Sequence, residues 1–211
     1  MTMISLSRVF LNSILMMTGL ICAQTIPCDS LQPVRCAPEK SYYQILKNPG
    51  SCIIHAEYIP EQPTVTLGWK ADKQIGMTHV LQWKWRVLRY PQGADERVEG
   101  RGDSPAAVYC LFSKGLRTYA LKYVYSTIVP TGTNFSDPGP NPFHRQWLIV
   151  LRSQSPGDLG KWKTEQVDFK KDFQNYFGFP APALKGIGLM TDGDGTMSKV
   201  SAEYSEFRFV P

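Results

Sequence analysis

The sequence predicts an all-β protein, a jelly-roll-like antiparallel β-sandwich with one short helix packed at an end. From Cys52 onward, apolar and polar residues alternate in short runs separated by Gly, Pro, Asn and Asp, which is typical of many short strands. Only one segment has a helical period, whereas a doubly wound sheet needs a helix between successive strands. The 211 residues, 43% of them hydrophobic, suffice for one substantial core.

The strands that support this fold class follow one another along the chain. The run VLQWKWRVLR, residues 80–89, puts four apolar side chains on one face: Leu81, Trp83, Trp85 and Val87. Five further runs predict strands: AAVYCLF (106–112), TYALKYVYS (118–126), RQWLIVLRS (145–153), LKGIGLM (184–190) and SAEYSEFRF (201–209). Because RQWLIVLRS is apolar on both faces, we expect it to be a central strand.

The one predicted helix is DFKKDFQNYFG, between the last strands. Its aromatic side chains recur at helical spacing: Phe169, Phe173 and Tyr176 or Phe177. Asp168 is the expected N-cap, because its carboxylate can accept a hydrogen bond from a free amide of the first turn. Gly178 is the expected end of the helix.

The N-terminal part of the chain predicts export. Arg8 precedes the apolar run VFLNSILMMTGLICA, which has the length of a signal peptide and is short for a membrane span. We therefore expect a signal peptide at 1–23, a Pro-rich extension across the sandwich at 24–50, and the β-sandwich domain at 51–211. No later stretch is apolar enough to be an integral membrane anchor, so the mature protein is expected in the periplasm or secreted.

Export also determines how the cysteines are interpreted. Cleavage after Ala23 leaves an even number of cysteines in an oxidising compartment: Cys28, Cys36, Cys52 and Cys110. Four cysteines allow three pairings. We expect a local Cys28–Cys36 bridge and a Cys52–Cys110 bridge between two strands. A zinc site is disfavoured, because the spacings lack paired C-x₂₋₄-C signatures.

The stretch GIGLMTDGDGT, residues 186–196, resembles the aspartate motif of haloacid-dehalogenase phosphatases. That motif must end the first strand of an α/β domain, whereas here it follows the penultimate predicted strand. An EF-hand calcium loop is disfavoured as well, because Met197 occupies the position that requires glycine. Three interpretations of Asp192 and Asp194 stay open: an ordinary polar turn, a calcium-binding turn and a ligand-gripping loop.

The formal net charge of +5 is scattered, and no stretch clusters five or more Lys or Arg residues. This distribution predicts a soluble basic protein that has no nucleic-acid partner. The tripeptide Arg101–Asp103 and its flank, RGDSP, match the motif that integrins bind. In an exported protein of this kind, a chance match in a turn is the favoured interpretation.

Several motifs in order resemble a known bacterial exported family. They are WKWRV (83–87), GADER (93–97), GDSPAAVYCLF (102–112), LKYVYS (121–126), NPF (141–143), LIVLRS (148–153), DFKKDFQNYFG and IGLMTDGDGT with AEYSEFRF. The family is domain of unknown function 3047, and the resemblance covers roughly residues 55–210. It implies no settled activity. The chain departs from the family pattern at Ser104 and Gly195, which weakens any metal or catalytic role assigned through it. The run AEYSEFRF also resembles the closing strand of galactose-binding-like jelly rolls.

Three functions compete for such a protein. The first is a binding module for a polysaccharide, an oligosaccharide or another extracellular polymer. Its ligand or calcium contacts are predicted at five residues: Arg97, Asp103, Arg152, Asp192 and Asp194. Tryptophans could stack on sugar rings, but Trp83 and Trp85 are expected in the core, so at most one or two tryptophans should be exposed.

The second function is a glycan-active enzyme with a carboxylate pair. Its candidate carboxylates are Asp95, Asp103, Glu165, Asp192 and Asp194. The third is a structural or envelope-interaction protein without a small ligand. The histidines and cysteines form no cluster that would favour nucleophilic catalysis. We therefore expect a binding protein rather than an enzyme, with calcium as the one candidate cofactor. The sequence does not indicate an oligomeric state.

Overall fold

The computed structural model describes residues 23–34, 40–71, 80–137, 139 and 141–210. The predicted signal peptide, apart from Ala23, and Cys36 lie outside these residues. Within the described ranges, no helix is both long and apolar enough to cross a membrane.

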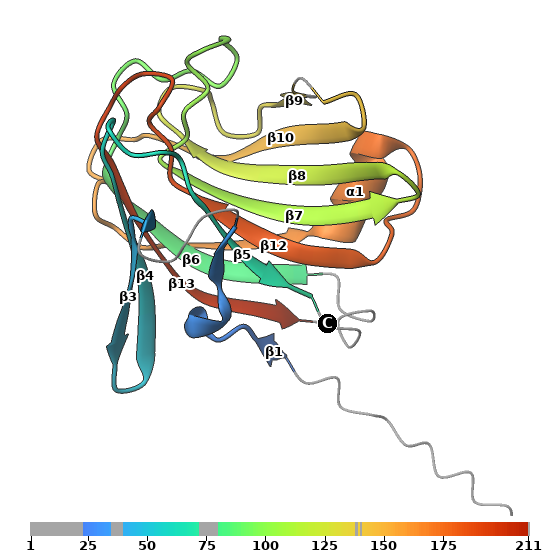
Figure 1. Ribbon diagram of the computed structural model, residues 1–211, viewed down its shortest axis with the longest axis horizontal. Helices are drawn as coiled ribbons and strands as arrows, with labels where there is room; N and C mark the ends of the chain where they lie inside the picture. The colour runs from blue at the N-terminus through green and yellow to red at the C-terminus, as the bar shows by residue number, and fades with distance from the viewer. Residues whose placement is uncertain (1–22, 35–39, 72–79, 138, 140, 211) are drawn as a thin grey trace, which may run out of the picture.

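Two β-sheets pack face to face and confirm the predicted jelly-roll-like sandwich (Figure 1). The first sheet contains, in spatial order, β11 (Lys163–Asp168), β6 (Val80–Arg89), β13 (Val200–Val210), β4 (Ser51–Tyr58) and β3 (Tyr43–Asn48), with β1 (Gln24–Thr25) paired to β13. The second contains β2 (Gln32–Val34), β5 (Thr66–Lys70), β12 (Leu184–Met190), β7 (Ala106–Lys114), β8 (Arg117–Ser126), β10 (His144–Ser153) and β9 (Asn134–Ser136). We refer to them as the six-stranded and the seven-stranded sheet.

One strand pairing differs from the antiparallel pattern that the sequence predicts. β10 runs parallel to β8, while the other strand pairs of the described residues are antiparallel. A parallel pair needs a long connection. Here the connection is residues 127–143, and it contains β9, which pairs antiparallel with β10 on its far side.

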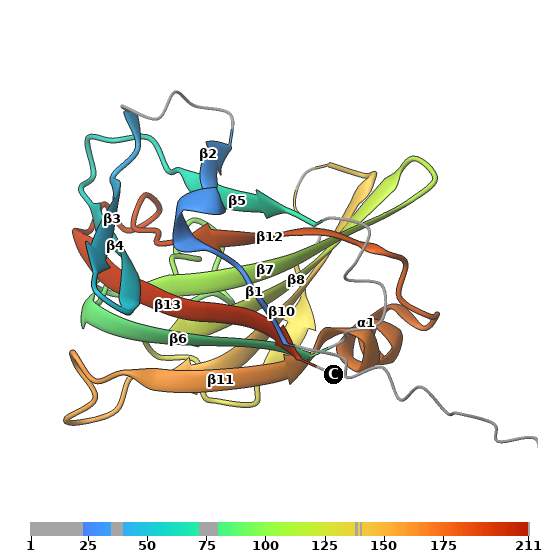
Figure 2. The same ribbon diagram turned by 90° about the horizontal axis from the view of Figure 1, so that it is seen from below.

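The core lies between the sheets, as the alternation in β6 predicts. Trp83 and Trp85 are 1% and 0% exposed, and their ring centroids lie 5.3 Å apart. The single helix α1 (Phe169–Phe177) closes one end of the sandwich (Figure 2). The Asp168 side chain accepts a hydrogen bond from Lys171 N, and Gly178 ends the helix at φ 79°. Both predicted helix boundaries are therefore confirmed.

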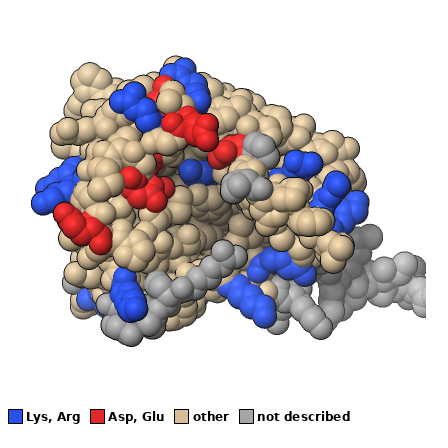
Figure 3. All heavy atoms as spheres, turned by 45° about the horizontal axis from the view of Figure 1, so that its top comes forward, with Lys and Arg blue, Asp and Glu red and all other residues tan. Residues whose placement is uncertain are grey.

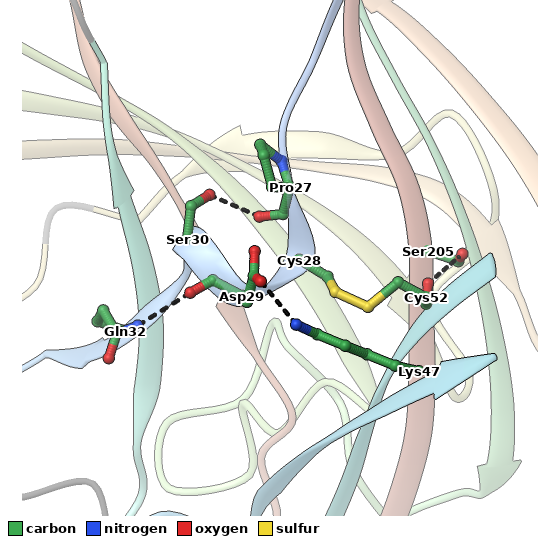
Figure 4. The surroundings of a disulfide bond; sticks show 8 residues. All are labelled: Pro27, Cys28, Asp29, Ser30, Gln32, Lys47, Cys52 and Ser205. Atoms are coloured by element: carbon green, nitrogen blue, oxygen red, sulfur yellow. Dashed lines mark hydrogen bonds and ion pairs between the residues drawn. A yellow bond between two sulfur atoms is a disulfide. The ribbon is translucent and has the colours of Figure 1, made fainter. Parts of the chain in front are cut away.

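The segment 24–50 contributes strands to both sheets, because β1, β2 and β3 all pair with strands of the sandwich. A 3₁₀ helix, η1 (Cys28–Ser30), lies beside the start of β4. There Cys28 forms a disulfide with Cys52 (Figure 4). An ion pair of 2.7 Å between Lys47 Nζ and Asp29 Oδ2 lies next to this bridge.

The predicted cysteine pairing is wrong. Cys52 pairs with Cys28 across 24 residues, so neither the Cys28–Cys36 nor the Cys52–Cys110 bridge exists. Cys110 is a free thiol, 0% exposed, and it faces the core from β7 of the opposite sheet. Burial away from water raises the pKa of this thiol, so it stays protonated and packs as a small apolar side chain.

Candidate ligand-binding groove

The outer face of the seven-stranded sheet carries the candidate site. Along β8, Leu121 and Tyr123 point into the core, so Lys122 between them points to the opposite face. Lys122 pairs in register with Tyr109 of β7 and Leu148 of β10. Although it lies on an outer face, Lys122 is only 5% exposed. Neighbouring side chains therefore enclose a cationic residue at the centre of this sheet.

Two cavities adjoin on this face. The larger, of about 1110 Å³, lies between the loop 96–102 and residues 133–139, with Leu148 at its base. The smaller, of about 310 Å³, is lined by Tyr109, His144 and Gln146 among others. Gln146 and Leu148 are two residues apart on one strand, so the cavities adjoin across the sheet. We call the two together the groove.

The surface view agrees with this arrangement. Figure 3 shows a hollowed face with acidic side chains gathered around the hollow and a basic side chain within it. The larger cavity forms where β9, the edge strand of the seven-stranded sheet, and the loop 96–102 both border Leu148. A surface of this size can hold a ligand larger than a single sugar ring.

Three of the predicted site residues meet at one end of β12. Carboxylate oxygens of Asp103, Asp192 and Asp194 all lie within 4.8 Å of one another. Asp103, 1% exposed, accepts hydrogen bonds from Gly195 N at 3.0 Å and from Thr196 N at 2.7 Å. Asp103 thus fixes the turn that carries the other two aspartates. Its burial also removes it from the surface, where an adhesion tripeptide would have to present it.

The turn itself requires glycine. A Cβ on Gly193 would meet the Ser198 carbonyl oxygen and the Val200 side chain, and one on Gly195 would lie 2.8 Å from the Gly100 carbonyl oxygen. Both contacts are closer than real Cβ atoms approach. The pattern Asp-Gly-Asp-Gly therefore serves close packing between this turn and the loop 96–102, in addition to any ligand it contacts.

Asp192 has a perturbed acidity. Burial first and the neighbouring Asp194 charge next raise its pKa to about 6, while Lys122 acts in the opposite direction. Thr64 Oγ1 donates to Asp192 Oδ1 at 3.2 Å and lies 3.1 Å from Asp194 Oδ2. Near neutral pH this carboxyl therefore exists in both protonation states.

Glu96 is a site residue that the sequence analysis missed. It is 8% exposed, lines the larger cavity, and accepts hydrogen bonds from Ser126 Oγ at 2.6 Å and Ser104 Oγ at 3.1 Å. Burial raises its pKa. The only signal in the sequence is its position in the motif GADER, in which the neighbouring Arg97 and Asp95 were chosen as the candidate ligand-binding and catalytic residues.

Lys122 was missed as well, because period-2 alternation marks it as an ordinary solvated residue. Burial alone would lower its pKa, but the phenol of Tyr109 and the carboxyl groups of Asp192, Glu96 and Asp137 together raise it, so Lys122 stays charged. The structure records no ion pair between Lys122 and any carboxylate of the described residues. Its ammonium group is thus held among acceptors without direct neutralisation.

The two predicted arginines occupy different places. Arg97 lines the larger cavity and binds Asp95 through two contacts of 2.8 Å. Arg152 donates to Glu165 Oε1 at 2.7 Å, and Trp85 Nε1 donates to the same oxygen at 3.0 Å. Because this pair links the two sheets, the structure does not bring Arg152 to the aspartates.

The tryptophans do not line the groove. Trp83 and Trp85 are in the core, and Trp69, Trp147 and Trp162 are only partly exposed. None of them borders either of the two cavities. The aromatic side chains that do border the groove are Tyr109 and Phe135.

Fold and groove together define a β-sandwich with a ligand-sized polar groove across one sheet. The chain belongs to the family described as protein of unknown function (DUF3047), whose model matches residues 31–208. The family resemblance inferred from the motifs is thereby confirmed.

Two solved structures have a similar fold. One is the xyloglucanase domain of NopAA, a type three effector from Sinorhizobium fredii in complex with cellobiose, with 10% identity, a TM-score of 0.46, and 88% of this chain and 96% of that chain covered. The other is endoglucanase 3 from Trichoderma harzianum, of family GH12, with 12% identity, a TM-score of 0.44, and 85% and 84% covered. No curated protein matches the sequence.

Proposed function

We propose that this protein is an exported carbohydrate-binding protein and that the groove holds an oligosaccharide or a stretch of polysaccharide. One observation carries the proposal: between Tyr109 of the smaller cavity and Leu148 of the larger one, the sheet holds a buried donor, Lys122. The acceptors Glu96 and Asp192 lie near it without an ion pair to it. A sugar hydroxyl both donates and accepts hydrogen bonds, so adjacent hydroxyls of one ring can satisfy both kinds of group.

The remaining walls suit the same ligand. Tyr109 and Phe135 supply partly buried aromatic surface against which the apolar face of a sugar ring can pack. Gln146, whose amide donates to Asp137 Oδ2 at 2.7 Å, offers further hydrogen-bonding atoms at the junction of the two cavities. Since the groove crosses several strands, it favours an extended chain over a single sugar.

Export is the second part of the proposal. The apolar run at 9–23 has the pattern of a signal peptide. The Cys28–Cys52 disulfide suits an oxidising compartment, where such bonds persist. Both observations support a periplasmic or secreted protein.

Thermal unfolding against a panel of neutral, basic and acidic oligosaccharides tests the binding proposal. A ligand at about 100 times its Kd adds about 2.7 kcal/mol to the free energy of unfolding, or about 5–10 °C in Tm for a protein of this size. Lys122→Met removes the buried ammonium at nearly constant volume and should abolish the shift. Lys84→Met, on the outer face of the other sheet where Lys84 pairs with exposed Glu206, is the matched control and should keep it.

The same experiment has a second variant in case Lys122→Met does not fold. Gln146→Ala shortens a wall of the smaller cavity and should weaken binding while leaving Tm without ligand within about 1 °C. Absence of a shift with every oligosaccharide, or an undiminished shift in both groove variants, would contradict the proposal.

Calcium at the aspartate cluster remains a prediction, and adding calcium or chelator to each melt tests it. Three carboxylates within 4.8 Å supply the oxygen ligands that calcium prefers. Asp103 already accepts two backbone amides, however, and Lys122 supplies a positive charge nearby. A Tm raised by calcium in the wild type and unchanged in Asp194→Asn would support a calcium site.

A glycan-active enzyme is the second candidate, favoured by the carboxyls of Asp192 and Glu96. Burial raises the pKa of both, that of Asp192 to about 6, and a carboxyl group with a raised pKa suits the role of general acid. Among the earlier candidates, Asp95 and Glu165 are instead bound to arginines. Release of reducing ends from a bound oligosaccharide, lost in both Asp192→Asn and Glu96→Gln, would establish this activity.

A further inference from the structure

We propose that the groove selects glycans whose sugar rings carry free amino groups. This inference rests on the proposed carbohydrate-binding function and adds the charge of the ligand to it. Its basis is the uneven distribution of charge over the molecule, together with the way in which each charged group of the groove is already bonded.

The groove is acidic on a basic protein. Three carboxylates line the larger cavity, those of Glu96, Glu99 and Asp137, against one guanidinium, that of Arg97. Arg97 is already neutralised by Asp95 at 2.8 Å. The whole chain carries a formal net charge of +5, so its excess positive charge lies elsewhere. Figure 3 shows the same contrast, with acidic side chains around the hollow and most basic ones beyond it.

Glu96 and Asp137 accept hydrogen bonds, but none of the three groove carboxylates is paired with a cation of the part of the chain that the structure describes. Glu96 accepts from two serine hydroxyls, and Asp137 accepts from the Gln146 amide. Neutral donors satisfy oxygen lone pairs but leave the negative charge in place. A ligand ammonium within hydrogen-bond distance would form a charge-assisted contact that a neutral sugar lacks, and a uronate would be repelled.

Lys122 supports a ligand at the same place. It is 5% exposed, lies on the sheet between Tyr109 of the smaller cavity and Leu148 of the larger one, and has no ion pair with a described carboxylate. Its ammonium is therefore free to donate to a sugar hydroxyl or to the ring oxygen of a ligand in the groove. Its one positive charge does not balance Glu96, Asp137 and Asp192, the carboxylates that raise its pKa. Lys122 therefore positions a sugar ring, and the net negative charge of the groove determines which charged substituents that sugar can carry.

Calorimetric titration with oligosaccharides of equal length tests the inference. The ligands are a glucosamine oligomer, its N-acetylated counterpart and a galacturonate oligomer, at low ionic strength and at about pH 6.5, where many of the sugar amines are protonated. We expect the free-amine oligomer to bind about tenfold more tightly than the N-acetylated one, and the galacturonate to bind most weakly. The tenfold ratio should shrink as salt is added.

Variants locate the selectivity. The double variant Glu99→Gln Asp137→Asn removes two charges from the groove while keeping side-chain size, and should bring the ratio of the two Kd values close to one. Both positions are at least partly exposed, so the variant is expected to fold. Glu206→Gln removes one charge from an exposed pair on the other sheet and should leave the ratio unchanged.

The outcomes separate this inference from the proposed function. Equal affinity for the free-amine and N-acetylated oligomers would overturn the charge selectivity and leave carbohydrate binding intact. Binding of none of the oligosaccharides would overturn both. An equal affinity for spermidine, a polyamine without sugar rings, would show that charge alone is recognised and would also overturn the inference.

Discussion

Replacing the buried Asp192 by asparagine should stabilise the protein at neutral pH and not in acid. The pKa of Asp192 rises from 3.8 to about 6, mainly because of burial and next because of the Asp194 charge. The two values differ by about 2, and each unit corresponds to about 1.4 kcal/mol, so ionising this carboxyl costs the folded state about 3 kcal/mol. Asp192→Asn removes the charge and keeps an acceptor for Thr64.

The sign of the pH dependence follows from the direction of the pKa change. The folded pKa lies above the unfolded one, so the folded protein binds the extra proton between about pH 4 and pH 6. The wild type therefore loses stability as the pH rises through that window, and the full cost persists above it. The gain from Asp192→Asn should reach at most about 3 kcal/mol at about pH 7.5, because Lys122 also loses a favourable neighbour in the variant. The gain should vanish near pH 4, because Asp192 of the folded wild type is then protonated and uncharged.

Urea-induced unfolding of both proteins across this pH range measures the difference. Asp158→Asn is the matched control, because Lys163 lowers the pKa of that exposed carboxyl. Its effect must have the opposite sign: the variant should be less stable than the wild type above the unfolded pKa. An Asp192→Asn protein that is less stable at neutral pH, or whose gain does not depend on pH, would refute the electrostatic account.

Three further predictions concern the turn and the disulfide. Asp103→Ala leaves two backbone amides without their acceptor and should lower the free energy of unfolding by about 3 kcal/mol in urea titrations; a loss below about 1 kcal/mol would show that water replaces the carboxylate. Gly193→Ala should lower Tm by several degrees because its methyl group meets backbone, whereas Gly102→Ala, with nothing within 4 Å of its added methyl group, should leave Tm nearly unchanged. Non-reducing peptide mapping should find Cys28 linked to Cys52, and any other partner for either cysteine would contradict the structure.

The sandwich was predictable because alternation in β6 and the caps of α1 are local signals. Trp83 and Trp85 face the core because alternate residues of a strand lie on the same face. Asp168 begins the helix by accepting a hydrogen bond from a backbone amide, and Gly178 ends it in the left-handed conformation. The cysteine pairing was not predictable, since it depends on where η1 meets β4 in space. Spacing favoured Cys28 and Cys36, but tertiary packing sets Cys28 beside Cys52 and buries Cys110.

The candidate site was predictable only where a motif marked it. The Asp-Gly-Asp-Gly turn directed attention to Asp192, and the structure joins it with Asp103 from a distant loop. Glu96 and Lys122, which give the groove its chemistry, lie in the family motifs GADER and LKYVYS, but neither motif indicates a binding role for them. Glu96 is buried where the loop 96–102 meets Ser104 and Ser126, and Lys122 is buried between its register neighbours Tyr109 and Leu148.

The burial of Lys122, which the strand pattern does not predict, has a physical cause that bears on the proposed function. Alternation along β8 assigns Lys122 to an outer face, and an outer lysine is normally solvated. Here the parallel pairing of β10 with β8 requires a long connection, and that connection adds β9 as the edge strand, where Asn134, Phe135 and Ser136 line the larger cavity. A lysine enclosed in this way has lost most of its hydration without gaining a paired carboxylate, which is costly unless neighbouring acceptors or a ligand compensate it. Lys122→Met therefore tests stability and binding together. Removing the ammonium should raise the free energy of unfolding in either case. If Lys122 has no role in binding, the variant should bind the ligand as well as the wild type does, whereas if Lys122 binds the ligand, the variant should not bind.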